Sequence, residues 1–147
     1  MSIVIRPMLR LDLPRVQETE RRAQATPWAA SLFAASLAAG HETWVLEVGR
    51  APAGHGVLSV RRTEASLLNL CVHPAFRGRG LGRRLLAHLV ERARLRGASG
   101  VRLLVRAGNR EALRLYGAAG FLEAGRRRGY YPAALGREDA LVLRLRL

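Results

Sequence analysis

The sequence predicts an α/β fold: a mixed, mostly antiparallel central sheet flanked by helices. Two observations lead to this prediction. Short runs of aliphatic and β-branched residues alternate with segments whose apolar residues recur at helical spacing. The chain has 147 residues, 49% of them hydrophobic, which is enough to bury one core without disulfides or metals. We therefore expect a single domain over residues 1–147, with no linker and no internal repeat.

The N-terminal half is predicted to contain strands and two helices. Asp12 reads as the N-cap of the first helix, and Gly40 as the end of the second. A turn at residues 49–52 joins two strands into a hairpin, and Pro74 ends the strand after it. The expected elements are strands at 3–6, 43–48, 55–62 and 66–72, a helix starting at Asp12, and a helix at 28–39.

The C-terminal half opens with the most regular helical pattern in the chain. Apolar residues recur at 81, 85, 86, 89 and 90, and Gly97 ends this helix. A strand follows at 101–105, and Asn109 caps a helix that runs to Tyr116 and is broken by Gly117. The last two strands are expected at 121–130 and 140–147, around a loop that contains Tyr131 and Pro132.

The composition limits the classes of function. The formal charge is +14, and every basic residue is arginine. Such a charge can attract polyanions, but these arginines are spread along the chain, so we interpret most of them as a solvated surface. A single cysteine excludes an intramolecular disulfide, and neither a membrane span nor a secretory signal is evident. These features predict a cytoplasmic protein.

Three alternating glycines stand between a predicted strand and the long helix. Gly78, Gly80 and Gly82 allow the backbone to turn sharply and to approach a ligand, and the helix N-terminus favours an anion. A P-loop needs a lysine, which this chain lacks. A dinucleotide fingerprint needs a third glycine three residues after its second, and Arg83 or Leu85 stands there instead.

The segment Arg77-Gly78-Arg79-Gly80-Leu81-Gly82, after a strand and before a helix, resembles the acetyl-CoA loop of the GNAT acetyltransferases. The resemblance covers essentially the whole chain and is closest to the RimI-type enzymes, which acetylate the N-terminal alanine of a ribosomal protein. The further motifs that carry it are Thr26-Pro27-Trp28, Glu64–Asn69, Asn109 with Leu115-Tyr116, Gly120-Phe121, Tyr130-Tyr131-Pro132 and Glu138-Asp139-Ala140.

This resemblance implies acetyl-CoA as cosubstrate, a GNAT-like fold and a set of site residues. Tyr116 matches the general acid that protonates the departing thiolate. Tyr130 and Tyr131 are expected to line the acceptor groove. The amine would attack the thioester directly, with backbone N–H groups stabilising the oxyanion. The residues implied in cofactor binding are Leu70, Cys71, Val72, Arg77, Gly78, Arg79, Gly80, Leu81, Gly82, Arg83 and Asn109.

The general base departs from the family pattern. RimI-type enzymes place a Glu where this chain has Leu104, which cannot accept a proton. An N-terminal amine has a pKa of about 8, so a minority is neutral at pH 7, and a water chain can replace the base at some cost in rate. A carboxylate such as Glu47 or Glu64 acting through water is a second option. A different acceptor, or weak activity, is a third.

Other residues receive plainer interpretations. Cys71 lies in an apolar strand and is expected to be a small core residue rather than a nucleophile. His73 precedes Pro74 and reads as a strand-end residue. The four histidines show no metal-ligand spacing, so we expect no metal site.

We therefore expect an N-acetyltransferase whose partner is a peptide or protein N-terminus, with a ribosomal protein as the case that the resemblance implies. Its alternatives are a GNAT enzyme that acetylates a small amine, and a weakly active acyl-CoA-binding protein. A nucleic-acid or ribosome-binding module is a different class, drawn from the charge alone. We expect no direct nucleic-acid role and no membrane role, and the sequence leaves the oligomeric state open.

Overall fold

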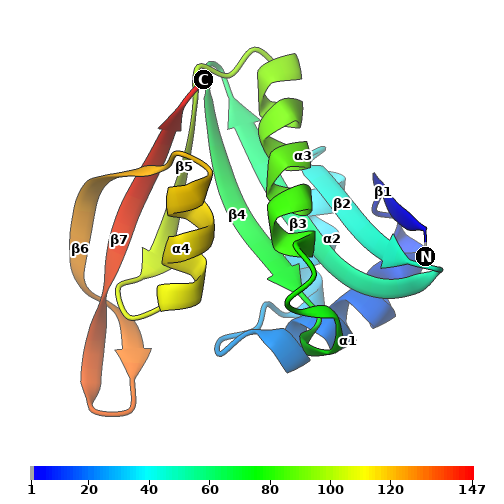
Figure 1. Ribbon diagram of the computed structural model, residues 1–147, viewed down its shortest axis with the longest axis horizontal. Helices are drawn as coiled ribbons and strands as arrows, with labels where there is room; N and C mark the ends of the chain where they lie inside the picture. Colours follow the sequence, from blue (N-terminus) through cyan, green and yellow to red (C-terminus); the bar gives the residue numbers. More distant parts are fainter. Residues whose placement is uncertain (1) are drawn as a thin grey trace.

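The structure, a computed structural model, describes residues 2–147 and contains one seven-stranded sheet with the strand order β1-β2-β3-β4-β5-β7-β6 (Figure 1). In chain order the elements are β1 (Ile3–Pro7), α1 (Leu13–Ala23), α2 (Ala30–Ala38), β2 (Glu42–Val48), β3 (Ala51–Arg61), β4 (Glu64–Val72), α3 (Leu81–Leu95), β5 (Gly100–Arg106), α4 (Arg110–Ala118), β6 (Leu122–Ala133) and β7 (Gly136–Arg146). The β4–β5 pair is parallel, and the other neighbouring strands are antiparallel. The predicted fold class is confirmed.

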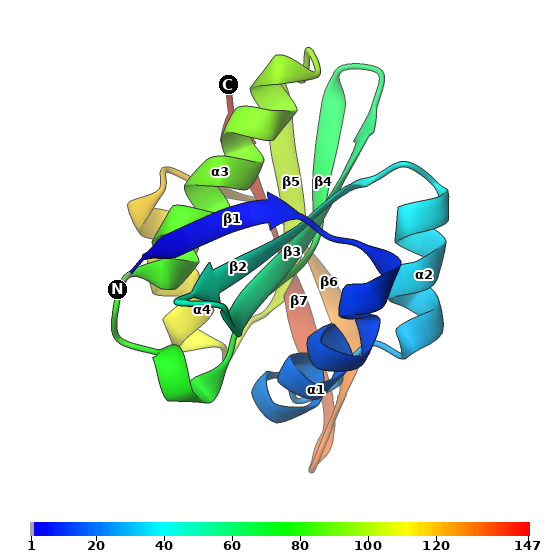
Figure 2. The same ribbon diagram turned by 90° about the vertical axis from the view of Figure 1, so that its right-hand side faces the viewer.

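The helices cover both faces of the sheet, as the side view shows (Figure 2). On one face α3 packs with its leucines against the strands, and Leu85 and Leu89 are fully buried in the larger core cluster. On the other face α1 and α2 cover a smaller cluster around Phe33 and Val57. Each helix buries one apolar stripe against the sheet, which is the layered arrangement that the alternating pattern predicts.

The sheet is split between β4 and β5. These strands pair at three positions, from Glu64 with Gly100 to Ser66 with Arg102, and then diverge, so the two halves of the sheet form a V (Figure 1). A register shift against β3 follows at once: Leu67 lies opposite Leu58, and Asn69 lies opposite Val57. Leu68 is therefore the extra residue of a β-bulge, which bends β4 and re-aims the residues after it.

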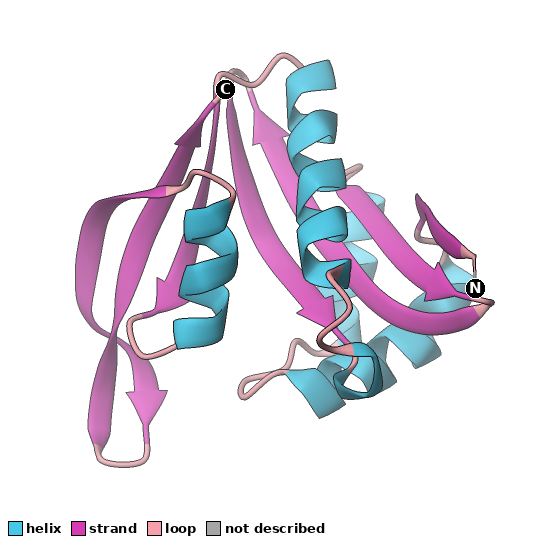
Figure 3. Ribbon diagram, in the orientation of Figure 1, coloured by secondary structure: helices cyan, strands magenta, loops and turns pink. Residues whose placement is uncertain are grey.

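The prediction of a long loop around Tyr131 and Pro132 was wrong. The structure has one long hairpin instead, in which Pro132 lies within β6 and a short turn leads to Gly136 at the start of β7 (Figure 3). Pro132 is tolerated because β6 is the outer strand of the sheet, where a missing N–H costs no ladder bond on the open side.

Two helix boundaries also differ from the prediction. α2 begins at Ala30, so Trp28 lies in the segment before it. α4 continues through Gly117 to Ala118, because a single glycine inside a helix costs only about 1 kcal/mol relative to alanine. Gly120, with a φ of 98°, lies just beyond that helix.

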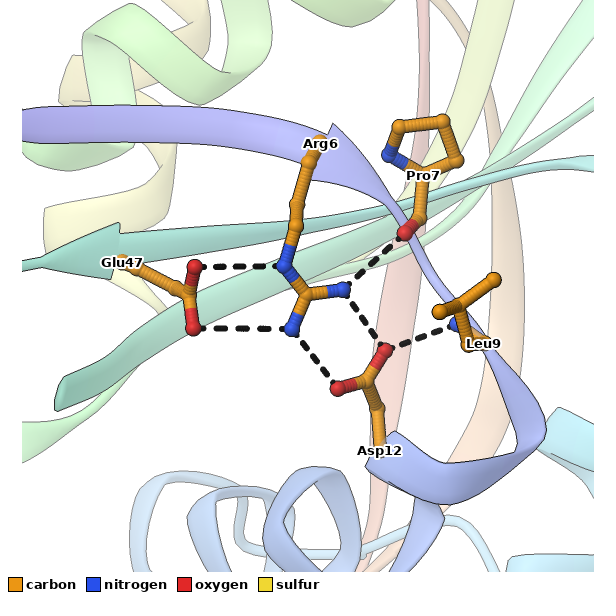
Figure 4. A network of polar contacts seen from close by, with 5 residues as sticks. All are labelled: Arg6, Pro7, Leu9, Asp12 and Glu47. Carbon is orange, nitrogen blue, oxygen red and sulfur yellow. Dashed lines mark hydrogen bonds and ion pairs between the residues drawn. The ribbon is translucent and has the colours of Figure 1, made fainter. Parts of the chain in front are cut away.

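Asp12 precedes α1 as predicted, but its carboxylate does not cap the helix. It accepts hydrogen bonds from the Leu9 N–H (2.7 Å) and from both terminal nitrogens of Arg6 (2.9 and 2.7 Å) (Figure 4). Arg6 also donates through Nε to Glu47 Oε1 at 3.1 Å. This network ties β1 and β2 to the turn before α1, on the far side of β3 and β4 from the split in the sheet.

Among residues 2–147, no helix is long and apolar enough to cross a membrane.

Candidate active site

A cavity of about 790 Å³ occupies the split between β4 and β5. One wall is the outer part of β4 from Leu67 to Val72, and the other is β5 from Leu103 to Arg106. The loop before α3 closes one end, and the segment after α1 reaches the other side. Because the two strands stop pairing here, the backbone groups along their inner edges no longer bond to each other and can face a ligand.

The glycine loop has the geometry that the sequence predicts. Gly78 and Gly80 have φ values of 77° and 75°, which residues other than glycine rarely adopt. The space beside them is open, because no atom lies within 4 Å of the position of an added Cβ at either residue. Gly80 is the N-cap of α3, so the unpaired N–H groups of the first helical turn face the end of the cavity. Gly82 has ordinary backbone geometry, and a Cβ there would lie 3.6 Å from Leu115.

The arginines of this loop do not share one role. Arg77 and Arg83 line the cavity, as do Leu81 and the three glycines. The Arg77 guanidinium also donates to the Ala23 carbonyl at 3.3 Å, which fastens the loop to the end of α1. Arg79 does not line the cavity; its guanidinium lies 5.2 Å from the centre of the Phe76 ring.

Along β4, the residues implied in cofactor binding face different directions. Leu70 presents its carbonyl to the cavity side, where Gln24 Nε2 donates to it at 3.3 Å. The carbonyl of Cys71 lies against Gly54 of β3 instead, since a Cβ on Gly54 would come within 2.7 Å of it. By the alternation of a strand, the Val72 backbone faces the same edge as Leu70. All three residues line the cavity with some atoms.

Asn109 and Tyr116 lie at the two ends of one short helix. Asn109 Oδ1 accepts from the Ala112 N–H at 3.1 Å and so caps α4, as predicted. Tyr116 is buried, packs edge-on against Phe121 with ring centres 5.6 Å apart, and lines the cavity. Burial, with a smaller contribution from Tyr131, raises the pKa of Tyr116. The phenol therefore keeps its proton at neutral pH and is chemically suited to donate it.

Arg106 lines the cavity and joins three segments of the chain at its wall. Its guanidinium donates to Thr26 Oγ1 (3.0 Å), to Glu138 Oε1 (3.1 Å) and to the Pro132 carbonyl (2.9 Å), and it lies 4.4 Å from the centre of the Tyr131 ring. These contacts join the segment after α1, the end of β5 and the β6–β7 hairpin.

Only one tyrosine of the predicted acceptor pair borders this space. Tyr131 lines the cavity and is half-buried, and burial raises its pKa. Tyr130 is exposed, stacks edge-on against Tyr131, and is absent from the cavity wall.

The two carboxylates considered as substitutes for the missing base lie elsewhere. Glu47 is paired with Arg6 in the network at β1 and β2. Glu64 lies at the start of β4, where the strands still pair, and forms a two-pronged contact with Arg144 at 3.0 Å. Neither residue lines the cavity, whereas Leu104 does. The structure therefore gives neither carboxylate the place of a base.

A buried polar cluster borders the cavity, and the sequence analysis missed it. Glu20 of α1 is 1% exposed; its Oε1 lies 2.9 Å from His55 Nε2, and its Oε2 accepts from Asn69 Nδ2 and the Trp28 N–H, both at 3.0 Å. A signal for it exists in the sequence, because Glu20 follows Val16 by four residues and so falls on the apolar face of α1.

Cys71 lies beside this cluster, and its sulfur is within 4.8 Å of ligand atoms of Glu20 and His55. Burial raises the pKa of the Cys71 thiol to about 12, so the sulfur stays protonated and is a poor nucleophile and a poor metal ligand at neutral pH. The predicted burial of Cys71 is confirmed, and so is the strand-end place of His73, whose Nδ1 accepts from the Ala75 N–H.

Comparison with known proteins agrees with this geometry. Residues 6–121 match the acetyltransferase (GNAT) family. The protein therefore belongs to the GNAT family and is an N-acetyltransferase that uses acetyl-CoA.

Two curated relatives and one crystal structure narrow the comparison. The [ribosomal protein bS18]-alanine N-acetyltransferase of Escherichia coli strain K12 is 40% identical over 134 residues, which cover 91% of this chain and 90% of that protein. The N-alpha-acetyltransferase RimI of Mycobacterium tuberculosis strain H37Rv is 36% identical over 136 residues, covering 88% and 84%. The crystal structure of the Escherichia coli ribosomal-protein-S18-alanine N-acetyltransferase has a TM-score of 0.93 at 37% identity, covering 99% of this chain and 94% of that one.

Proposed function

We propose that this enzyme acetylates a protein N-terminal α-amine, with the N-terminal alanine of ribosomal protein bS18 as its acceptor in the cell. One observation supports this most directly: a single cavity connects the glycine loop, Tyr116 and Tyr131. A cosubstrate held at the loop and an acceptor entering beside Tyr131 would therefore meet in the split between β4 and β5. The names of the curated relatives supply the acceptor class.

The cofactor-binding role falls to the loop and the free edge of β4. Gly78 and Gly80 give the backbone a shape that leaves room for phosphate oxygens, and the first turn of α3 supplies N–H donors and a positive dipole end. Arg83, in that first turn, adds a fixed positive charge. The Leu70 and Val72 backbones face the split, where they pair with an extended amide-bearing arm as a neighbouring strand would.

Bound acetyl-CoA supplies a thioester carbonyl as the electrophile. Tyr116, protonated and beside the split, donates its proton to the leaving sulfur. The amine loses its proton to water, because the residue at the usual position of the base is Leu104. At pH 7 roughly one-tenth of an amine with a pKa of about 8 is already neutral, so this route costs about tenfold in rate.

Tyr131 and Arg106 are placed to contact the first residues of the acceptor chain, since both line the cavity and lie against each other. Tyr130 has an outer role at most, because it lies outside the cavity wall. We assign the reaction to the cytoplasm, where newly made ribosomal proteins are found and a lone buried thiol stays reduced.

A peptide-acetylation assay tests this function. The enzyme is incubated with acetyl-CoA and a synthetic peptide carrying the bS18 N-terminus, beside the same peptide with a blocked α-amine, and products are read by mass spectrometry. We expect one acetyl group on the free peptide and none on the blocked one. Acetylation of small amines, with no reaction at any peptide α-amine, would refute the proposed acceptor class but leave the family assignment intact.

A further inference from the structure

Asn69 has an unusual environment for a residue in a β-strand. It is 7% exposed, lines the cavity, and lies directly after the bulge at Leu68. Its Oδ1 is shielded from solvent and has no hydrogen-bond partner among residues 2–147. An unpaired buried acceptor costs about 1–3 kcal/mol, so such a group calls for a ligand that completes it.

The orientation of this amide is fixed by its neighbour. Asn69 Nδ2 donates to Glu20 Oε2 at 3.0 Å, and a flipped amide would place Oδ1 against the carboxylate. Glu20 is itself held by His55 and by the Trp28 N–H. The cluster therefore keeps the donor end of Asn69 on Glu20 and leaves only the acceptor end unpaired.

Asn69 and Tyr116 lie on opposite faces of the sheet, which places an amine at Asn69 across the split from the proton donor. Asn69 lies opposite Val57, whose side chain belongs to the cluster under α1 and α2, and directly opposed residues of antiparallel strands share a face. Tyr116 belongs to α4, and its side chain packs in the core cluster on the opposite face. An amine at Asn69 and a proton donor at Tyr116 would thus lie on opposite sides of the split, as direct transfer through a thioester in the split requires.

The chemistry of the group completes the match. A carboxamide oxygen accepts from the N–H of either an amine or an ammonium ion, and it cannot itself be protonated at neutral pH. Glu20 lies directly behind this amide, whereas Leu104, on the other wall of the cavity, is apolar. A carboxylate ligand has no N–H or O–H group to donate to Oδ1 and would gain nothing comparable from this arrangement.

We propose that Asn69 is the residue that receives the acceptor's α-amine, and that Glu20 is a positioning residue that orients its amide. This rests on the proposed function, and it adds a specific group that recognises the free N-terminus. The hydrogen bond orients the amine lone pair toward the split and favours acceptors that carry an N–H donor at this point.

The test compares two peptides on matched variants. The probes are an alanine-starting peptide and its analogue in which a propionyl group replaces the alanine, so that only the amine is lost. Binding is measured by calorimetry in the presence of CoA for the wild type, Asn69→Ala and Val57→Ala. Val57→Ala is the matched control, because it truncates the buried cross-strand neighbour of Asn69, which does not line the cavity.

For the wild type and for Val57→Ala we expect the amine-bearing peptide to bind at least about tenfold more tightly, the effect of one hydrogen bond to a charged group. For Asn69→Ala the preference should fall below about threefold, with the KM for acetyl-CoA unchanged. If Asn69→Ala fails to fold, Asn69→Ser decides, since its small polar side chain suits the polar cluster better than a methyl group does but lacks the carboxamide oxygen.

The outcomes separate the two proposals. A folded Asn69 variant that keeps the wild-type preference for the amine would overturn the role of Asn69 and leave the proposed function standing. A wild type that acetylates no peptide, and binds both peptides equally, would overturn both. A loss of preference in Val57→Ala as large as in Asn69→Ala would assign the effect to packing and would also overturn the role.

Discussion

The two halves of the cavity are built in different ways. We define the cofactor half as residues 70–72, 77–83 and 109, and the acceptor half as Glu20, Asn69, Leu104, Arg106 and Tyr131. The cofactor half consists mainly of backbone: two glycines in left-handed geometry, a helix N-terminus and a free strand edge. The acceptor half consists of side chains from four elements, held by ion pairs and hydrogen bonds.

This difference predicts which half of the cavity should differ more in sequence between members of the family. Backbone geometry is set by local sequence and tolerates few substitutions, so a family can share one cosubstrate through one loop. Side chains can be exchanged one at a time, and Leu104 in place of a glutamate is such an exchange. We therefore expect the proposed cofactor half to hold what the family shares, and the proposed acceptor half to set the substrate and the rate.

Of the substitutions considered, the largest loss of activity is expected at Tyr116, which lies between the two halves. Tyr116→Phe removes the hydroxyl but keeps the ring contact with Phe121, so the fold should be unchanged. We expect kcat to fall about 100-fold, as for loss of a general acid, while the KM for acetyl-CoA stays within about twofold. Steady-state kinetics and a thermal melt measure both. An unchanged kcat would show that the thiolate leaves without a proton from Tyr116.

The next effect tests the missing base of the acceptor half. Leu104→Glu should raise kcat/KM for an N-terminal peptide by about tenfold at pH 7, since about nine-tenths of the amine is protonated there. Because the gain comes from deprotonating the amine, it should disappear near pH 9, where most of the amine is neutral. A pH series of kcat/KM for both proteins measures it. A gain independent of pH would mean that the glutamate acts by binding and not as a base.

In the cofactor half, the effect of a glycine-to-alanine substitution on the KM for acetyl-CoA should depend on the backbone geometry of that glycine. Gly78→Ala or Gly80→Ala forces an L residue into a left-handed conformation that costs about 1–2 kcal/mol, so the KM for acetyl-CoA should rise about fivefold or more. Gly82→Ala should change it little, because the new methyl makes ordinary contacts. Gly97→Ala, equally strained but outside the cavity, is the control that lowers only the melting temperature. Equal effects at all three loop glycines would contradict a geometric role.

The contrast between local backbone geometry and contacts of distant side chains also explains which features could be predicted from the sequence. Signals confined to a few neighbouring residues were predicted correctly: the glycines of the loop, the Asn109 cap and the end of β4 before Pro74. Contacts between distant segments were not predicted. The Arg106 bond to Thr26 spans 80 residues, and the Glu20 bond to Asn69 spans 49. No local pattern encodes such a pair, although the position of Glu20 on the apolar face of α1 was a usable sign.

The errors have the same origin. Tyr131 and Pro132 are residue types that are common in loops. They are part of a strand here because β6 is an edge strand of the sheet, where a proline is tolerated. Asp12 does occupy the N-cap position of α1 as predicted, but its carboxylate binds Arg6 and the Leu9 N–H instead of the helix N–H groups. In each case a tertiary contact decided between two local conformations that the sequence alone allows.

The smallest effect on activity is expected outside both halves, in the Arg6 network. Hydrogen bonding from Arg6 lowers the pKa of Asp12 in the folded state. A depressed carboxyl pKa stabilises the fold at pH values above the unfolded pKa of about 3.9, and this contribution disappears as pH falls through the folded value. Asp12→Asn should therefore lower the free energy of unfolding by about 1–2 kcal/mol at pH 7, and by much less near pH 3.

Urea denaturation at both pH values measures this change, and kcat/KM at pH 7 should match that of the wild type. Glu18→Gln is the control: its ion pair with Arg22 is exposed, so solvent screens it and the free energy of unfolding should hardly change. A loss for Asp12→Asn that persists at low pH would assign the effect to shape rather than charge. A loss of activity without a loss of stability would place the Arg6 network in contact with the acceptor half, and so would contradict the separation of that network from the cavity.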